Sequence, residues 1–449
     1  QAAVALSRFG LGRLAGEPLP GNPRNWLLDQ FERYAAQSQA WAAEPPSEVL
    51  LKYYSDYQRD VRGQDELAAR QRLAKLSQER YRASVNARAA SALTTQAPFA
   101  ERLVHFWSNH FAVSVDKSPL ALLAGSFEAE AIRPHVFGRF EDLLLAAERH
   151  PAMLLYLDQA RSTGPSSPVA MRTAPERQRG LNENLAREIL ELHTLGVRTG
   201  YTQEDVIQLA RALTGWSVSG LPGLPANGRS GVYSFSAALH EPGTRSVLAR
   251  TYSQRGEAQA VAILRDLAAH PATAKHIAGK LARHFAGDDP PPSLEERLAE
   301  TYLLNGGDLA SMYRVLVESP ECWAGAPRFK TPWDWSVSAL RGLGWCDDIG
   351  ELRLASLLTQ LGQPAWRPGS PAGYADTSEN WMAPDLLLRR VEVANRLAEH
   401  AATMIDARSV AAQLLPGGVS DVTATAISRA ESPSMGLAML LASPEFLRR

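Results

Sequence analysis

Apolar residues recur at spacings of three and four along most of the chain, which is the periodicity of amphipathic helices. The pattern predicts long amphipathic helices over residues 24–42 and 47–94, and the second is long and charged enough to form a helical arm. Shorter helices are predicted by the same pattern in the remaining chain, over 97–113, over 137–157 with a break at His150 and Pro151, over 203–213, and over two segments hinged at His270 and Pro271. The expected fold class is therefore all-α, in a bundle-like arrangement of many helices.

Two irregular segments interrupt this pattern. Residues 161–180 are rich in Pro, Gly and Ser, and such a long stretch within a compact domain is usually either functional or disordered. We expect it to cover the helix that follows. Residues 217–253 contain the alternating run GVYSFSAALH, which predicts at most a small β-hairpin near 230–240.

The helices divide into three regions by position. Residues 1–96 contribute the long N-terminal helices, 97–290 form a central helical core, and 291–449 form a C-terminal helical region packed on that core. The connector DDPPPS at 288–293 marks the second boundary, because consecutive prolines cannot continue a helix.

Charge and composition restrict the class of protein. The 449 residues include 47 basic and 48 acidic side chains, so no overall field attracts nucleic acid or anionic lipid. No apolar run reaches the roughly 18 residues that span a bilayer, which predicts a soluble chain without an integral membrane segment. Two cysteines, Cys322 and Cys346, are compatible with one disulfide or with two buried thiols.

The run NENLAREILELHTLG at 182–196 concentrates polar residues within a helical pattern. One interpretation is a solvated helix face on which Arg187 forms i,i+4 ion pairs with its neighbours. The other is a site in which Arg187, Glu188 and Glu191 point into a cleft, where carboxylates bind a divalent cation or act in acid/base chemistry. Asn182 and Asn184 serve either as helix caps or as binding groups.

The run ERLVHFWSNHF at 101–111 is a second candidate. Asn109 falls on its polar side, whereas His110 falls among apolar residues. His105 and His110 are five positions apart, so they do not form the i,i+4 pair of a zinc motif. A buried core histidine is the ordinary interpretation of His110, and a catalytic base or ligand is the alternative.

Three further features are weaker candidates. The stripe Thr273, His276, Lys280 and His284 lies on one side of a helix and could contact an anion, although an exposed basic face is the more ordinary interpretation. His240 and Asp158 lie at loops, where sites are commonly built. The chain lacks GxSxG, Walker, GxGxxG and CxxC motifs, which argues against the enzyme classes that they mark.

Several of these segments together resemble a known family. WSNHF at 107–111, LNENLAREILELHTLGV at 181–197, GYTQEDVIQLARALTGW at 200–216, HPATAKHIAGKLARHF at 270–285 and the closing SPEFLRR are similar to the bacterial family called domain of unknown function 1800. The resemblance covers nearly the whole chain. The family pattern falls on WxNHF at 107–111 and on Asn182, Asn184, Arg187, Glu188, Glu191 and Thr194, and His193 corresponds to a position that can hold Phe.

The resemblance implies an exported, periplasmic or extracellular α-helical protein, whose family genes often neighbour those of proteins resembling sulfatases and phosphatases. Two hypotheses follow. The first is an enzyme, a hydrolase or lyase acting on an extracytoplasmic polymer or ester, with Arg187, Glu188, Glu191 and His110 as catalytic groups, a divalent metal as possible cofactor, and Asn109, Asn182, Asn184, Asp158 and His240 as binding groups. The second is a non-catalytic partner or assembly factor for an exported sulfatase- or phosphatase-like protein.

Two structural expectations separate these interpretations. We expect the WSNHF helix and the 182–195 helix to pack against each other, since each has one apolar side. We also expect Arg187→Ala and Glu191→Gln to cost more than the roughly 0.5 kcal/mol of stability that is usual at exposed positions. In a preorganised site, Glu191→Gln should leave folding largely intact or raise the melting temperature while abolishing activity or metal content. In a buried structural network it should lower the melting temperature by several degrees, and on a solvated face both variants should behave like the parent.

Overall fold

Helices dominate the computed structural model, which describes residues 1–61, 66–173, 180–345, 350, 352–401 and 407–449. The predicted all-α class is confirmed, with two small antiparallel sheets as the β-structure of the described chain. The α-helices of the N-terminal and central parts are α1 (Ala2–Val4), α2 (Pro23–Leu28), α3 (Gln30–Arg33), α4 (Ser47–Asp60), α5 (Glu66–Thr94), α6 (Pro98–His110), α7 (Leu120–Phe127), α8 (Phe140–Arg149), α9 (Pro151–Tyr156), α10 (Asn184–Glu188) and α11 (Gln203–Leu213).

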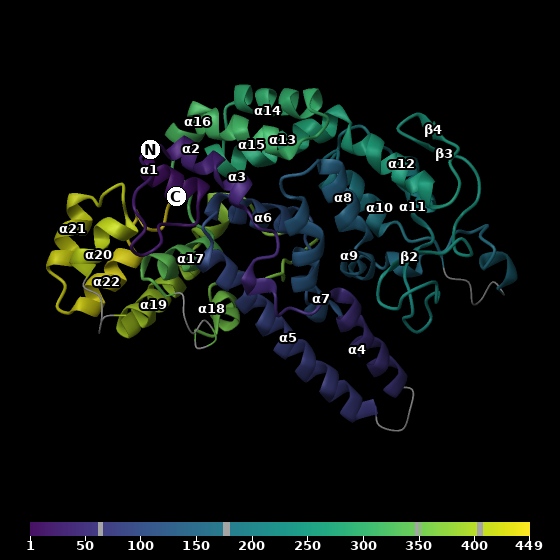
Figure 1. Ribbon diagram of the computed structural model, residues 1–449, viewed down its shortest axis with the longest axis horizontal. Coiled ribbons are helices and arrows are strands. Elements are labelled where there is room, and N and C mark those ends of the chain that lie inside the picture. The colour runs from purple at the N-terminus through teal and green to yellow at the C-terminus, as the bar shows by residue number, and fades with distance from the viewer. Residues whose placement is uncertain (62–65, 174–179, 346–349, 351, 402–406) are drawn as a thin grey trace.

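The later helices follow the two sheets. They are α12 (Glu257–Ala268), α13 (Pro271–Ala286), α14 (Pro292–Leu304), α15 (Leu309–Glu318), α16 (Pro320–Ala324), α17 (Pro332–Gly342), α18 (Leu354–Gln360), α19 (Pro384–Ala401), α20 (Ala407–Leu414), α21 (Asp421–Ser428) and α22 (Pro433–Leu441). Within the described residues, no helix is long and apolar enough to cross a membrane. Figure 1 shows an elongated molecule with α19–α22 at one end and the sheets at the other.

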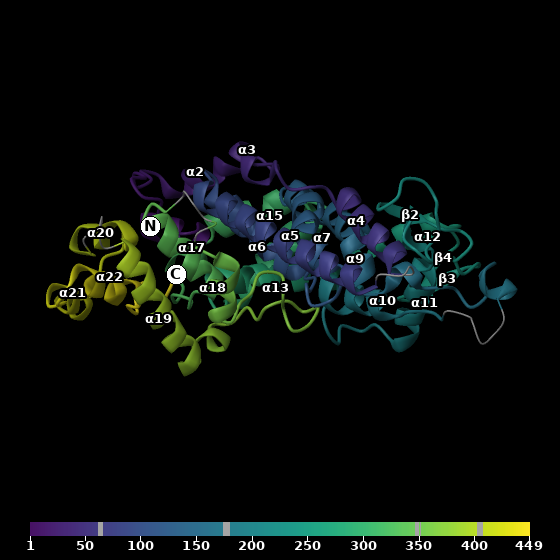
Figure 2. The same ribbon diagram turned by 90° about the horizontal axis from the view of Figure 1, so that it is seen from below.

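The arm is a helical hairpin, so the prediction of one helix over 47–94 is wrong. The helices α4 and α5 lie side by side (Figures 1 and 2), and Figure 1 shows them projecting from the body. Gly63, a weak helix former, lies between them in the sequence. The predicted helix over 24–42 is also shorter, because Tyr34 leaves the helical conformation and only a 3₁₀ turn follows at Gln39–Trp41.

Most other helix boundaries follow the predicted signals. Pro98 occupies the first turn of α6, where its missing N–H costs nothing. Thr202 and Asp205 form a reciprocal capping box at the start of α11. The break between α8 and α9 falls at His150 and Pro151 as predicted, and the ring of His150 accepts a hydrogen bond from the Ala152 amide at 3.1 Å.

The β-structure is more extensive than the single hairpin expected near 230–240. Strands β1 (Trp216–Val218) and β2 (Tyr233–Phe235) pair antiparallel, and so do β3 (Arg245–Val247) and β4 (Arg250–Tyr252). Each strand has only three residues, too few for alternation to be recognised in the sequence.

One hydrophobic core runs through the molecule and includes residues of all three regions defined above. Trp107 is fully buried, and its indole N–H donates to the Tyr313 hydroxyl at 2.6 Å. That hydroxyl donates in turn to the Val136 carbonyl at 2.9 Å. Because these partners satisfy both polar groups, the aromatic rings are buried without an unpaired donor.

The two motif helices meet at their C-terminal ends, so the predicted contact is confirmed there and not along their whole apolar sides. His110, at the end of α6, donates from Nε2 to the carbonyl of His193 at 3.1 Å, and the two rings lie 6.1 Å apart. His193 belongs to a π-helical turn, Ile189–His193, that continues α10.

The described part of the loop 161–180 contacts the polar run at one point, where the Asn182 amide donates to the Ser162 hydroxyl at 3.0 Å. Gly164 and Val169 donate backbone hydrogen bonds to Leu239 and Ala238, at 2.9 and 3.0 Å, so this segment lies against residues 238–241. Residues 174–179 lie outside the described chain. The guanidinium side chain of Arg187 remains 38% exposed.

The base of the arm is docked tightly on α7. Gly125 of α7 faces Ser84 of α5, and a Cβ at Gly125 would lie 2.4 Å from the Ser84 hydroxyl. Ser84 also donates to the Glu44 carboxylate at 2.7 Å. Only glycine permits this approach of the two helices.

We therefore expect Gly125→Ala to lower the free energy of unfolding by about 1–3 kcal/mol, the usual cost of forcing an extra methyl into a packed contact. Thermal melting measures the loss. Adding Ser84→Gly removes the clash, so the double variant should lose less than the sum of the single losses. Gly21→Ala is the control, because its Cβ would meet nothing within 4 Å. Additive losses would contradict this account of the crossing.

Candidate functional site

A pocket of about 370 Å³ lies between α6, α13, α17 and the segment 363–376. Its walls combine charged, amide and aromatic side chains, which is the composition typical of a small-molecule site. The polar and aromatic lining residues are Arg88, Arg102, His105, Phe106, Ser108, Asn109, Lys280, His284, Thr331, Trp333, Asp334, Gln363, Trp366, Tyr374 and Asp376.

Asn109 holds the 363–376 segment against α6. Its amide donates to the Tyr374 carbonyl at 2.9 Å and accepts from the Tyr374 amide at 2.7 Å. Gly373 has a positive φ of +79°, and a Cβ there would lie 2.3 Å from the Asn109 carbonyl. The asparagine of the WSNHF motif thus lines the pocket and positions one of its walls.

Lys280 brings an amine to the pocket. It is half-buried, and its Nζ lies 3.0 Å from Nδ1 of His110. The His193 carbonyl can only accept, so Nε2 of His110 carries the ring hydrogen and Nδ1 accepts from Lys280. Burial, together with the charge of Lys280, lowers the pKa of His110 well below its ordinary value and keeps the ring neutral.

The environment of Lys280 favours loss of its proton. Burial lowers its pKa to about 8, and the charge of Asp376 only partly offsets this effect. Within the described residues, Lys280 forms no ion pair within 4 Å. A lysine whose pKa approaches neutrality can act as a base or a nucleophile.

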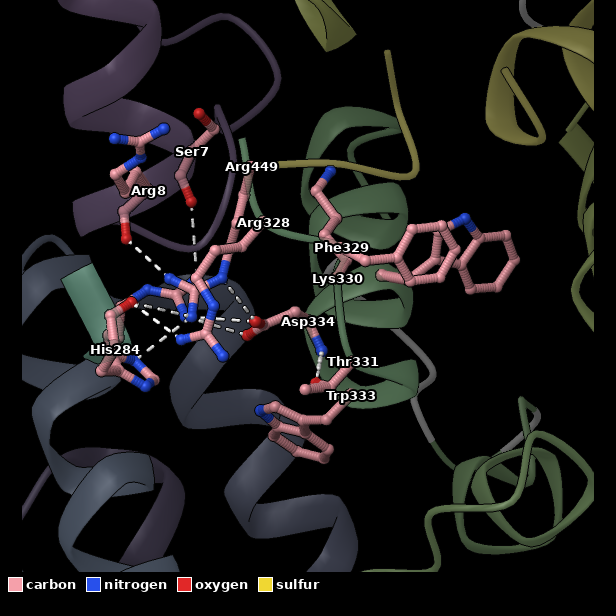
Figure 3. Close-up of polar contacts among 12 residues, drawn as sticks. Ser7, Arg8, His284, Arg328, Phe329, Lys330, Thr331, Trp333, Asp334 and Arg449 are labelled. Carbon is pink, nitrogen blue, oxygen red and sulfur yellow. Dashed lines mark hydrogen bonds and ion pairs between the residues drawn. The ribbon is translucent and has the colours of Figure 1, made fainter. Parts of the chain in front are cut away.

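A buried ion pair forms part of the pocket wall. Asp334, at the start of α17, accepts from Arg102 of α6 at 3.1 and 3.2 Å and lies 3.1 Å from Nε of Arg449. Burial alone would raise the pKa of Asp334, but the two guanidinium groups hold it below its ordinary value. Arg449 also donates to the Arg8 carbonyl at 3.0 Å, so the last residue of the chain meets the π-helical turn Ala5–Phe9 here (Figure 3).

The second lining carboxylate is also neutralised from behind. Asp376 lies 3.1 Å from Arg328 and 3.4 Å from the ring of His284. Arg328 and Arg449 both reach the backbone carbonyl of His284, at 3.1 and 3.4 Å (Figure 3). Each lining aspartate is therefore paired with a cation, and the pocket carries no excess of negative charge.

Lys330 lies beside this network with its ammonium over the Phe446 ring, 3.9 Å from its centre. Its Nζ also donates to the Ser338 hydroxyl at 3.0 Å. The side chain is 4% exposed, and burial lowers the pKa of Lys330 to about 7 against the attraction of Asp334.

The polar cluster on α10 is placed elsewhere, on the surface. Arg187 pairs with Glu183 at 3.2 Å and with Glu191 at 3.7 Å, in the i,i+4 pattern of a solvated face. Burial raises the pKa of Glu188, whose side chain is half-buried. The structure does not bring Arg187, Glu188 or Glu191 to the pocket.

The asparagines and loop residues predicted as binding groups have structural partners. Asn182 accepts from the Asn184 backbone amide at 2.8 Å, which is a helix-capping contact. Asp158 forms an exposed ion pair with Lys117 at 2.6 Å. The buried ring of His240 lies 2.8 Å from the Thr214 carbonyl.

His193 forms a second buried polar pair. Its Nδ1 lies 2.6 Å from the Glu148 carboxylate, and both side chains are fully buried. The pair lies directly behind His110, whose ring is bonded to the His193 backbone. Of the stripe on α13, His276 bonds to the Leu192 carbonyl at 3.0 Å, and Lys280 and His284 line the pocket. The prediction of an exposed basic face is therefore wrong.

A family model described as protein of unknown function, DUF1800, matches residues 4–448. The chain belongs to this family. The resemblance inferred from the WSNHF and 181–197 motifs is thereby confirmed for nearly the whole chain. No curated protein and no solved structure gives a significant match to this DUF1800 chain.

Several pocket residues of the DUF1800 chain escaped the sequence analysis. Arg88, Trp333, Trp366 and Asp376 come from distant helices and from an irregular segment, and no local motif connects them. Across the described ranges, no group of three or more His, Cys, Asp or Glu side chains is placed to hold a metal ion. Cys322 is a buried free thiol, and Cys346 lies outside the described residues.

The surface placement of Arg187 predicts a small effect of its removal. We expect Arg187→Ala to change the free energy of unfolding by no more than about 0.5 kcal/mol, since exposed i,i+4 pairs each contribute only a few tenths. Thermal melting of the purified variant measures this. A fall of several degrees in the melting temperature would instead indicate a coupled network on α10.

Lys330 predicts a specific pH dependence of stability. Between pH 7 and about 10 the unfolded chain holds a proton on Lys330 that the folded chain has lost, so this residue makes stability rise with pH. Lys330→Met lacks this contribution. We expect the free energy of unfolding of the variant to exceed that of the parent by about 2–4 kcal/mol near pH 7 and by much less near pH 10. Melting temperatures across this range measure the difference, and a constant difference would contradict the assignment.

Proposed function

We propose that this protein is an enzyme, a hydrolase or lyase, whose active site is the pocket between α6, α13 and α17. The observation that carries the proposal is the amine of Lys280 at the pocket wall, held by the neutral ring of His110 at 3.0 Å. A pKa of about 8 leaves a fraction of this amine unprotonated at neutral pH. General bases work best with a pKa near the operating pH.

The proposed chemistry is proton transfer by Lys280. In a hydrolase the neutral amine takes the proton of an attacking water, and in a lyase it takes a proton from a substrate carbon. The ammonium then returns a proton to the leaving group. His110 orients Nζ and remains neutral, so it is a positioning residue in this scheme.

The aromatic lining supports an organic substrate. Trp333, Trp366, Phe106 and Tyr374 supply flat apolar surface beside the polar groups. The export implied by the family resemblance makes an extracytoplasmic polymer or ester the proposed substrate. The surface cluster of Arg187, Glu188 and Glu191 has no part in this proposal.

A second candidate is a partner role toward an exported sulfatase- or phosphatase-like protein. The observation in its favour is a set of exposed apolar side chains on the C-terminal helices. These are Leu388 and Val391 on α19, Val422 on α21, and Met435 and Met439 on α22. Exposed apolar groups of this kind suit protein contacts. Retention of the pocket chemistry after Leu388→Ser and Val422→Ser would separate the two roles.

We expect Lys280 to react with acetic anhydride along a pH profile centred near pH 8, because burial favours its neutral amine. Peptide mass spectrometry measures the extent of acetylation at each pH. Lys275, exposed on the same helix, is the reference amine within each sample. His110→Phe removes the acceptor of Lys280 and should shift the profile, whereas Lys275→Gln should not. If Lys280 followed the same profile as Lys275, the proposed role would fail.

A further inference from the structure

Arg88 is held between two tryptophan rings at the wall of the pocket. Its guanidinium carbon lies 4.7 Å from the centre of the Trp333 ring and 5.1 Å from that of Trp366. The whole residue is 8% exposed. Contact with two aromatic rings restricts the guanidinium group, which donates hydrogen bonds only from its edge.

One edge of Arg88 has a protein partner. Its Nε forms an ion pair with the Glu128 carboxylate at 3.1 Å, without the geometry of a hydrogen bond. The same carboxylate accepts hydrogen bonds from Ser108 at 3.0 Å and from Trp366 at 3.2 Å. Arg133 pairs with the same carboxylate at 3.4 Å. The negative charge of Glu128 is therefore shared among several groups, so it neutralises Arg88 only in part.

The other edge of Arg88 has no such partner. Considering only the described residues, the two terminal nitrogens of Arg88 form no hydrogen bond with protein, although the residue lines the pocket. Nε is the atom of Arg88 that is buried without a hydrogen bond, whereas the terminal nitrogens are not enclosed in this way and lie at the pocket, where water or a ligand can accept from them. A guanidinium end of this kind matches the two oxygens of a carboxylate, phosphate or sulfate group.

Arg88 and Lys280 are the lining cations available to a ligand, because the other charged lining residues are paired with protein groups. Arg102 is engaged with Asp334, and Asp376 is engaged with Arg328 and His284. Lys280 uses a single hydrogen bond, to His110, of the three that an ammonium group can donate. The pocket therefore offers two incompletely used cations and no unpaired lining carboxylate within the described chain.

We propose that the pocket binds an oxyanion group of its substrate, with the terminal nitrogens of Arg88 donating to two of its oxygens. The inference rests on the proposed function in taking the same pocket as the active site. Lys280 would then lie beside the bound group, where it can act on an atom next to the anion. An acidic sugar, a carboxylic acid or a phosphate or sulfate ester has this chemistry.

Protection of Lys280 from acetylation tests the inference on the unmodified protein. We expect glucuronate, inorganic phosphate or sulfate to slow the acetylation of Lys280 in a saturable way, while the reference Lys275 is unaffected. Potassium chloride at equal ionic strength controls for screening of charge. The three anions distinguish a carboxylate from a phosphate or sulfate site, because the matching group protects at the lowest concentration. Absence of saturable protection by all three would overturn the inference.

Variants of Arg88 test which residue is responsible. We expect Arg88→Gln to raise the half-protecting concentration roughly 10- to 100-fold, and Arg88→Lys to restore it only in part, because an ammonium group lacks the paired donors. Arg82→Gln, exposed on the same helix, is the matched control and should leave protection unchanged. Equal protection in the parent and in a folded Arg88→Gln variant would overturn the assignment to Arg88.

These outcomes separate the inference from the proposed function. A Lys280 profile near pH 8 without anion protection would leave the proposed base intact and overturn the oxyanion site. If Lys280 were acetylated along the same pH profile as Lys275, its proposed role as a base would fail. The anion site would then be tested by isothermal titration calorimetry, with the anion that protects at the lowest concentration, on the parent and on Arg88→Gln. Loss of binding in that variant supports the site, and unchanged binding overturns it.

Discussion

The ion pair between Arg102 and Asp334 is the contact on which the pocket depends. It joins α6 to α17, and both side chains are almost completely buried, with 4% and 8% of their surface exposed. Removing a carboxylate and a guanidinium from water costs several kcal/mol each, so the pair is stable only while its geometry and its further hydrogen bonds are kept. Arg102 supplies one of these by donating from Nε to the Gly10 carbonyl at 2.7 Å. The two helices cannot separate without exposing a single buried charge on each side.

This constraint explains why a polar pocket can persist inside a helical protein. The lining aspartates are neutralised by arginines, of which Arg102 also lines the pocket and Arg328 and Arg449 do not, so the cost of burying each carboxylate is offset by ion pairs. Asn109 then fixes the segment that closes the pocket through two backbone hydrogen bonds. The two lining cations that remain incompletely paired are Arg88, beside two tryptophan rings, and Lys280, bonded to a neutral histidine.

Much of the fold could be predicted from periodicity and capping, because those signals are local. Pro98, the His150–Pro151 break and the Thr202–Asp205 capping box each marked a helix end correctly. The candidate site was harder to predict than the fold, because a helical wheel identifies the polar side of a helix but not what that side contacts. On α10 that side faces solvent, whereas on α13 a similar stripe with Lys280 and His284 faces the pocket. Arg88, Trp333 and Asp376 share no local pattern, since tertiary packing alone brings them together.

The tight crossing at Gly125 has a consequence for the rotation of α5. Ser84 and Arg88 are four residues apart, so they lie on the same side of the helix, one turn from each other. Contact of Ser84 with Gly125 therefore sets the angle at which Arg88 enters the space between the tryptophans. A residue inserted between Ser84 and Arg88 would turn the guanidinium by about 100° away from the pocket. Insertions nearer Glu66 would not change the angle between Ser84 and Arg88 about the helix axis. The arm can therefore change length at its outer end without moving Arg88 away from the pocket.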